Sequence, residues 1–139
     1  MVDKNLILRK ISSLDDYLKQ VSEFSGVTID EYRSDWKTQR IVERTLQMMI
    51  ETSADIANHI ISDKKMRVPA SYSDTFRVLV ENDVIDRDLF SILDKMAKFR
   101  NIVVHQYEDV DAEIVIVILK KHLDDFGKFK DAVLEVLKK

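Results

Sequence analysis

The sequence predicts an all-α fold, an up-and-down bundle of about five helices. Two observations support this. Only two glycines and one proline occur among 139 residues, too few for the turns of a hairpin-rich or barrel fold. Apolar residues also recur every three or four positions along most of the chain, the spacing of amphipathic helices. With 45% hydrophobic residues, one domain spanning 1–139 can build its own core.

The first predicted helix ends near Gly26 and presents one apolar stripe. The stripe follows spacings of four and three: Ile7, Ile11, Leu14, Leu18 and Val21. The segment 28–35 is polar and rich in acids, and no helix is predicted there. Ser34 or Asp35 is expected to cap the second helix, because both side chains accept hydrogen bonds from free backbone N–H groups.

The second predicted helix is long and apolar on more than one side. Its main stripe is Val42, Leu46, Met49, Ser53, Ile56 and Ile60, while other faces carry Ile41, Met48 and Ile50. A helix that is apolar on several faces must bury several faces. We therefore expect it to lie centrally or to meet a partner chain.

A connection is predicted from Ser62 to Ser73, because the periodicity breaks there and the only proline, Pro69, lies within it. A short helix should follow from Asp74 to Glu81, capped by Ser73 or Asp74. The polar pair Asn82 and Asp83 should end it.

Two further helices complete the prediction. One carries the apolar positions Leu89, Ile92, Met96, Phe99 and Val103, and the segment Asp109–Asp111 ends it. The last runs continuously from Ala112 to Leu137. Its stretch Ile114–Leu119 would also suit a buried strand, but a lone strand would have no second strand to pair with, so helix is preferred.

Several classes of protein are excluded or disfavoured. The chain has no cysteine, which excludes disulfides and thiolate sites and favours the cytosol. No apolar run approaches a membrane span, and no glycine-rich phosphate loop or dinucleotide fingerprint occurs. The formal net charge of −3 lacks the basic surplus of many nucleic-acid binders, although a local basic cleft remains compatible with it.

The most informative segment contains Arg100, Asn101, His105 and Tyr107 within eight residues. Guanidinium binds phosphate through a fixed fork of donors, and imidazole transfers protons near neutral pH. Together these groups suit phosphodiester chemistry. Lys95 and Lys98 precede them and are candidate contacts to an RNA backbone, although lysines on helices usually lie on solvated faces.

Helix geometry complicates this site. At about 100° per residue, Asn101 and His105 lie about 40° apart, whereas Arg100 and His105 lie about 140° apart. Either the helix ends near Val104, so that His105 and Tyr107 turn, or Arg100 acts beside the His105 of a second protomer.

The pattern Arg-Asn-x-x-x-His-x-Tyr resembles the HEPN superfamily, and within it the HepT-like toxins. The likeness extends over nearly the whole chain and includes the stretch from Gln47 to Asp55, the loop Pro69–Tyr72 and the run Phe99–Asn101. HepT-like toxins are the ribonuclease halves of toxin–antitoxin pairs. Their antitoxin is a small MNT-type nucleotidyltransferase.

The resemblance implies a HEPN-like homodimer that cleaves tRNA or mRNA without a metal or cofactor, leaving a 2′,3′-cyclic end. Arg100 and His105 would be catalytic, and Asn101 would orient His105 or cap the helix. Tyr107 would be the residue to which the antitoxin attaches AMP. The alternative function is a non-catalytic helical module that binds a nucleotidyltransferase or a nucleotide.

Other interpretations of single residues stay open. Arg100 could be an ordinary ion-paired arginine, and His105 a cation at a helix C-terminus. Two sets have metal-ligand spacing on helices but are common on solvated faces: Asp55, His59 and Asp63, and His122 with Asp125. Two aromatic residues near the start of the second helix could stack a base, but are expected to anchor the loop to the core: Tyr32 and Trp36.

Overall fold

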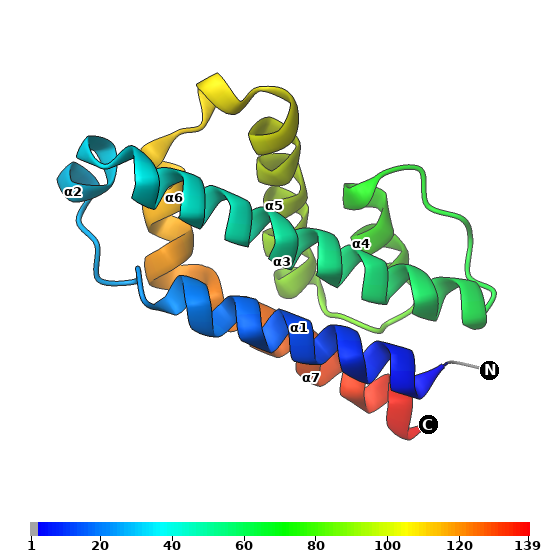
Figure 1. Ribbon diagram of the computed structural model, residues 1–139. Coiled ribbons are helices and arrows are strands. Elements are labelled where there is room, and N and C mark those ends of the chain that lie inside the picture. The colour runs from blue at the N-terminus through cyan, green and yellow to red at the C-terminus, as the bar shows by residue number, and fades with distance from the viewer. Residues whose placement is uncertain (1–2) are drawn as a thin grey trace.

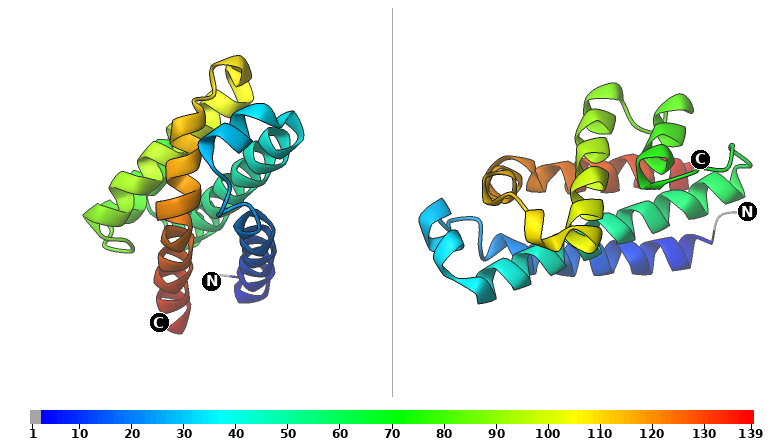
Figure 2. Two further views of the ribbon diagram at one scale, coloured as in Figure 1. Left: turned by 90° about the vertical axis from the view of Figure 1, so that its left-hand side faces the viewer. Right: turned by 90° about the horizontal axis from the view of Figure 1, so that it is seen from above.

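Helix α3 (Trp36–Asp63) runs through the middle of the structure, a computed structural model that describes residues 3–139. Helix α1 (Lys4–Ser22) packs antiparallel along it, and α7 (Leu123–Lys138) returns toward the N-terminal end of α1, so both chain ends lie at one end of the molecule (Figure 1). Helices α4 (Tyr72–Glu81) and α5 (Arg87–His105) pack on its other side (Figure 2). The described residues contain no strand, which confirms the all-α prediction.

The central position of α3 follows from its sequence. Every residue of the predicted main stripe is buried, and a second set of apolar residues is buried too: Ile50, Ala54, Ala57 and Ile61. Each large aliphatic side chain removed from water contributes about 1.5–3 kcal/mol. Helices α1, α2, α4, α5 and α7 all contact α3. The expectation that α3 buries more than one face is confirmed.

A short helix that the sequence analysis did not assign, α2 (Ile29–Ser34), precedes α3. It begins with a capping box: the Thr28 hydroxyl accepts from the Glu31 N–H, and the Glu31 carboxylate accepts from the Thr28 N–H. Helix α1 ends at Ser22 rather than near Gly26. Asp35 caps α3 as expected, accepting from the backbone N–H groups of Lys37 and Thr38.

The connection between α3 and α4 is tied down at both ends. Lys65 takes a left-handed conformation (φ 55°), and the Met66 N–H donates to the Ile61 carbonyl, which closes the end of α3. Arg67 donates to both Asp74 and Glu81. These bonds from Arg67 lower the pKa of Asp74 to about 2. The loop therefore fixes the start of α4.

Helix α4 begins earlier than predicted, at Tyr72. Its cap is Ser71, whose hydroxyl accepts from the Asp74 N–H at 3.0 Å. The expected caps, Ser73 and Asp74, both lie inside the first turn instead. Tyr72 thus lies at the start of the helix.

The C-terminal segment is helical but not one continuous α-helix. Helix α6 (Ala112–Val117) leads into a π turn, η2 (Ile118–His122), and then into α7, which runs in a different direction (Figure 1). The predicted single helix from Ala112 to Leu137 is wrong in this respect. A π turn pairs residues five apart and disturbs the regular ladder. The alternative of a strand at Ile114–Leu119 is wrong as well.

A short 3₁₀ turn, η1 (Tyr107–Asp109), joins α5 to α6. Among residues 3–139, no helix is long and apolar enough to cross a membrane.

Candidate functional site

Arg100 projects from α5 toward α3 and is held by three neighbours. Its Nε and Nη2 atoms each lie 2.9 Å from Glu51 Oε2, and Nη1 donates to Asn101 Oδ1 at 3.2 Å. The guanidinium carbon lies 4.4 Å from the ring centre of Tyr72. The Arg100 side chain is only 15% exposed, which is unusual for an arginine without a structural or binding role. Its plane is thus fixed by a carboxylate, an amide and an aromatic face.

Glu51 is the residue of this site that sequence reasoning missed. It comes from α3, and its Oε2 atom also accepts from Gln47 Nε2 at 3.0 Å, one helical turn away. Gln47 therefore positions Glu51, and Glu51 positions Arg100. The chain separates Glu51 and Arg100 by 49 residues, so no local pattern could have paired them.

His105 is the last residue of α5. The Gln106 N–H donates to the Ile102 carbonyl at 2.8 Å, so the helix continues one residue beyond the expected end at Val104. The imidazole is exposed, and no hydrogen bond or ion pair involves it within the described part of the chain. The ring is therefore open to a ligand.

The structure joins part of the predicted site within one chain. Arg100 and Asn101 are hydrogen-bonded, and Asn101 and His105 lie one helical turn apart on the same exposed side of α5. Arg100 and His105 do not contact each other. Arg100 reaches the His105 side of the helix only through its contact with Asn101.

Tyr107 lies in η1 and is 64% exposed. It lines a cavity of about 370 Å³ between α3 and α5, here called the polar groove. The other residues lining this groove are Arg40, Glu43, Arg44, Gln47, Val103 and Val104. Gln47 connects the groove to the Glu51–Arg100 pair.

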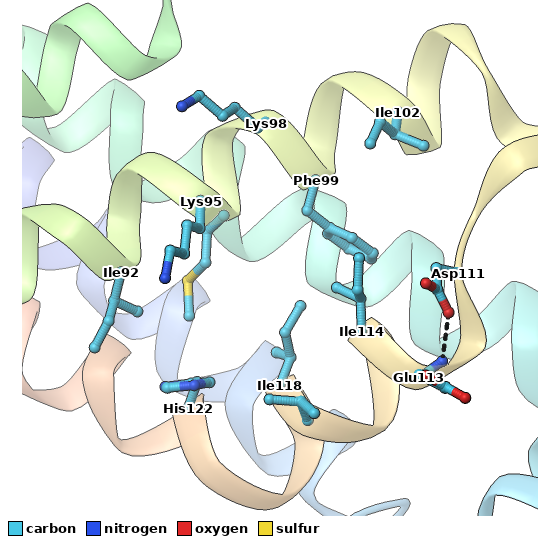
Figure 3. A pocket seen from close by; sticks show the side chains of 12 residues that line it. Ile92, Lys95, Lys98, Phe99, Ile102, Asp111, Glu113, Ile114, Ile118 and His122 are labelled. Atoms are coloured by element: carbon cyan, nitrogen blue, oxygen red, sulfur yellow. Dashed lines mark hydrogen bonds between the residues drawn. The ribbon is translucent and has the colours of Figure 1, made fainter.

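Lys95 and Lys98 lie elsewhere. They line a larger cavity of about 560 Å³ between α5 and α6 with η2, here called the apolar groove, whose walls are mainly aliphatic side chains and Phe99 (Figure 3). Lys98 pairs with Asp94 at 3.0 Å. Within one chain the two lysines are not brought together with Arg100.

The structure also tests the two aromatic residues near the start of α3. Tyr32 is buried, and its hydroxyl donates to Glu43 Oε2 at 3.3 Å, so its expected role as an anchor is confirmed. Burial raises the pKa of Glu43 and of Tyr32. Trp36 is 64% exposed, so the expectation that it anchors the loop to the core is wrong. Asp35 caps the helix just before it and leaves its ring in solvent.

The residues with metal-ligand spacing form pairs rather than clusters. Asp55 pairs with Lys10 and lies 3.8 Å from His59, and His122 Nδ1 lies 2.9 Å from Asp125. Among the described residues, no group of three or more acidic, histidine or cysteine side chains is arranged to hold a metal ion.

The chain is similar to proteins of known activity along most of its length. A family model described as ribonuclease HepT-like matches residues 14–133. The mRNA nuclease HepT of Shewanella oneidensis is 33% identical over 129 residues, which cover 93% of this chain and 96% of the relative. The tRNA nuclease HepT of Aphanizomenon flos-aquae is 25% identical over 125 residues, or 90% and 85% of the two chains.

A solved structure extends this similarity to the fold. It contains the tri-AMPylated HEPN toxin of Shewanella oneidensis in complex with its MNT antitoxin. The toxin is 32% identical to this chain and matches it with a TM-score of 0.87, covering 97% of this chain and 99% of the toxin.

Proposed function

Because the chain belongs to the HepT-like ribonucleases, we propose that it is a metal-independent endoribonuclease that cuts tRNA or mRNA. The family membership confirms the resemblance drawn from the Arg-Asn-x-x-x-His-x-Tyr pattern. One observation carries the proposal: an exposed, unpartnered His105 lies one turn beyond Asn101, and Asn101 is bonded to a fixed Arg100. We place this activity in the cytoplasm, where its RNA substrates occur.

In the proposed reaction the 2′-hydroxyl of one nucleotide attacks the adjacent phosphorus. The new O2′–P bond forms as the P–O5′ bond breaks, which leaves a 2′,3′-cyclic phosphate and a 5′-hydroxyl. His105 either takes the proton of the 2′-hydroxyl or, when protonated, gives one to the leaving O5′ atom, and water carries out the other proton transfer; the histidine contributes about 10²–10⁴ in rate. Arg100 neutralises the charge that grows on the phosphoryl oxygens, and Asn101 holds Arg100 through its Oδ1 atom.

Arg100 is held in place by Glu51, and we assign Glu51 as a positioning residue. The carboxylate fixes the guanidinium plane through two donors and leaves Nη1 on the Asn101 side. A fixed arginine loses less freedom when it binds a phosphate than a mobile one does.

We further propose that the active form is a homodimer. Arg100 and His105 lie about 140° apart around α5. A site that uses both side chains therefore takes Arg100 from one chain and His105 from the other. A two-fold axis would create two such composite sites.

Mixing inactive Arg100→Ala and His105→Ala chains should then restore about a quarter of the wild-type rate, because half the dimers are mixed and each regains one site. A mixture that stays inactive while forming mixed dimers contradicts the composite site.

The proposed partner is an MNT-type nucleotidyltransferase that attaches AMP to Tyr107 and so silences the toxin. The exposure of Tyr107 and its place in the polar groove support this role. A phosphate there would add negative charge close to the RNA path. Incubation with the partner and ATP should raise the mass of the wild-type chain but not of Tyr107→Phe.

The second candidate function is a non-catalytic module that binds a nucleotidyltransferase. The observation in its favour is the Glu51–Arg100 pair, which already neutralises the guanidinium.

The deciding experiment is cleavage of total cellular RNA by wild-type protein and His105→Ala, with EDTA present and the product ends typed chemically. We expect the wild type to leave cyclic phosphates and His105→Ala to be inactive. The control is His59→Ala, which removes a half-exposed histidine of α3 and should cleave normally. Absence of cleavage by a wild-type chain free of AMP would reject the nuclease and favour the binding module.

A further inference from the structure

Two arginines of the polar groove have no part in the proposed chemistry. Arg40 and Arg44 lie four residues apart on α3 and therefore on one face of the helix. The same face continues through Gln47 to Glu51, and both arginines line the groove together with Tyr107. One continuous surface thus leads from the arginine pair to the Glu51–Arg100 pair.

The pair is available to a ligand. Arg44 is exposed and forms no ion pair within the described chain, and the side chain of Arg40 is 63% exposed with Glu43 at 3.9 Å. By contrast, Arg67 is occupied by two carboxylates and Arg100 by one. An arginine without a close partner keeps its fork of donors free for a phosphate.

Glu43 is the acidic side chain among the residues that line this groove. It is buried, and its Oε2 atom accepts a hydrogen bond from the Tyr32 hydroxyl, while its Oε1 atom lies 3.9 Å from Arg40 Nη1. Burial also raises its pKa. The groove is therefore positive at its exposed rim.

We propose that Arg40 and Arg44 form a phosphate-binding subsite for the RNA strand, beside the phosphate on which Arg100 and His105 act. This inference rests on the proposed action on RNA. Along α3, Arg44 lies seven residues before Glu51, about 10 Å at 1.5 Å per residue. The subsite therefore holds a phosphate of the same strand near the cleaved one, and the exposed ring of Tyr107 lies on that path, where a base can stack on it.

The chain contains a matched alternative. Lys95 and Lys98 also present two positive charges near the motif, but they line the apolar groove on another side of α5. If charge alone determined RNA binding, the two pairs would be equivalent. The geometry assigns the role to the arginines.

The test compares Arg40→Gln/Arg44→Gln with Lys95→Gln/Lys98→Gln. Binding is measured by fluorescence anisotropy with a 2′-O-methyl oligoribonucleotide, which cannot be cleaved, and kinetics are measured with the matching unmethylated RNA. The arginine variant should bind at least about tenfold more weakly and raise KM with kcat nearly unchanged. The slope of log affinity against log salt should fall by about 0.7, the value for one lost phosphate contact on a single strand. The lysine variant should behave like the wild type.

Other outcomes separate this inference from the proposed nuclease function. The subsite alone is overturned if the wild type cleaves RNA and the arginine variant binds and cleaves it equally well. It is also overturned if the lysine variant is the one that is impaired. A wild type that binds methylated RNA through the arginines but cleaves nothing overturns the nuclease and keeps the subsite. A wild type that neither binds nor cleaves overturns both.

Arg40→Lys/Arg44→Lys should recover part of the affinity, and circular dichroism checks that every variant is folded.

Discussion

The two grooves beside α5 differ in the kind of side chain that lines them. The polar groove, toward α3, is lined by charged and amide side chains, and its Gln47 is hydrogen-bonded to Glu51, which binds Arg100 across the two helices. The apolar groove, toward α6, is lined mainly by aliphatic side chains, with Lys95 and Lys98 beside them (Figure 3). Helix α5 therefore makes directional polar contacts on one side and hydrophobic packing contacts on the other.

This difference shows that proximity in sequence is a poor guide to a shared site. Lys95, Lys98 and Arg100 form one basic run in the sequence, yet the two lysines line the apolar groove and Arg100 is directed toward Glu51 of α3. Substitutions in the polar groove should change activity with little effect on stability, and substitutions in the apolar groove should do the reverse.

The largest effect is expected from Arg100→Lys. Lysine keeps the charge, but a single ammonium cannot bond Glu51, reach Asn101 and stack on Tyr72 at once. The rate of RNA cleavage should fall by about 10²–10³, the cost of losing a donor to a developing anion. Arg77→Lys, an exposed arginine of α4, is the control in the same kinetic assay. Equal rates for the wild type and Arg100→Lys would show that only the charge matters.

In the apolar groove, Ile118→Ala should reduce stability without changing the chemistry. Ile118 is buried in η2, and loss of a buried aliphatic side chain costs about 2–5 kcal/mol. Ile114→Ala, which removes a half-exposed side chain from the same groove, should cost less than about 1 kcal/mol. Denaturant unfolding measures both. A drop in kcat for folded Ile118→Ala would mean that the two grooves are coupled.

Glu51→Gln is expected to change both kinetic constants. Without its charged partner, Arg100 attracts phosphate more strongly, so KM should fall. The guanidinium is also less well oriented, so kcat should fall by about tenfold or more. Steady-state kinetics on one oligoribonucleotide separates the two effects. A rise in kcat would instead identify Glu51 as an inhibitory contact.

The smallest effect concerns the pH dependence of stability. The raised pKa of Glu43 means that folding increases its affinity for a proton. The free energy of unfolding should therefore decrease as pH rises from below the ordinary glutamate pKa of about 4.3 through the raised value. Glu43→Gln should lack this component and keep an acceptor for Tyr32. Denaturant unfolding at a series of pH values measures it.

The control for the pH series is Glu23→Gln, since Glu23 is exposed after α1. This variant should keep the wild-type dependence on pH. If Glu43→Gln also kept it, another group would be responsible.

Local patterns predicted the helices well because each buried stripe repeats every three or four residues. The capping box at Thr28 and Glu31 was also readable as a helix start, so the omission of α2 was avoidable. The bend after α6 could not be predicted, because Ile118–His122 contains no glycine, proline or other sign of a break. The motif residues Arg100, Asn101 and His105 were found as a local cluster, but the Glu51–Arg100 pair depends on how α3 and α5 cross.

The π turn at Ile118–His122 makes the shape of the apolar groove sensitive to the deletion of a single residue. Because it accommodates one residue more than an α-helical turn does, deleting an exposed residue such as Lys120 would allow α6 and α7 to merge into a regular ladder. Helix α6 would then continue in line with α7 instead of running in a different direction from it (Figure 1). The side chains that α6 now presents to α5, including Ile114, would face a different direction. A single-residue deletion would thus reshape the apolar groove, while the polar groove, formed by α3, α5 and η1, would be left intact.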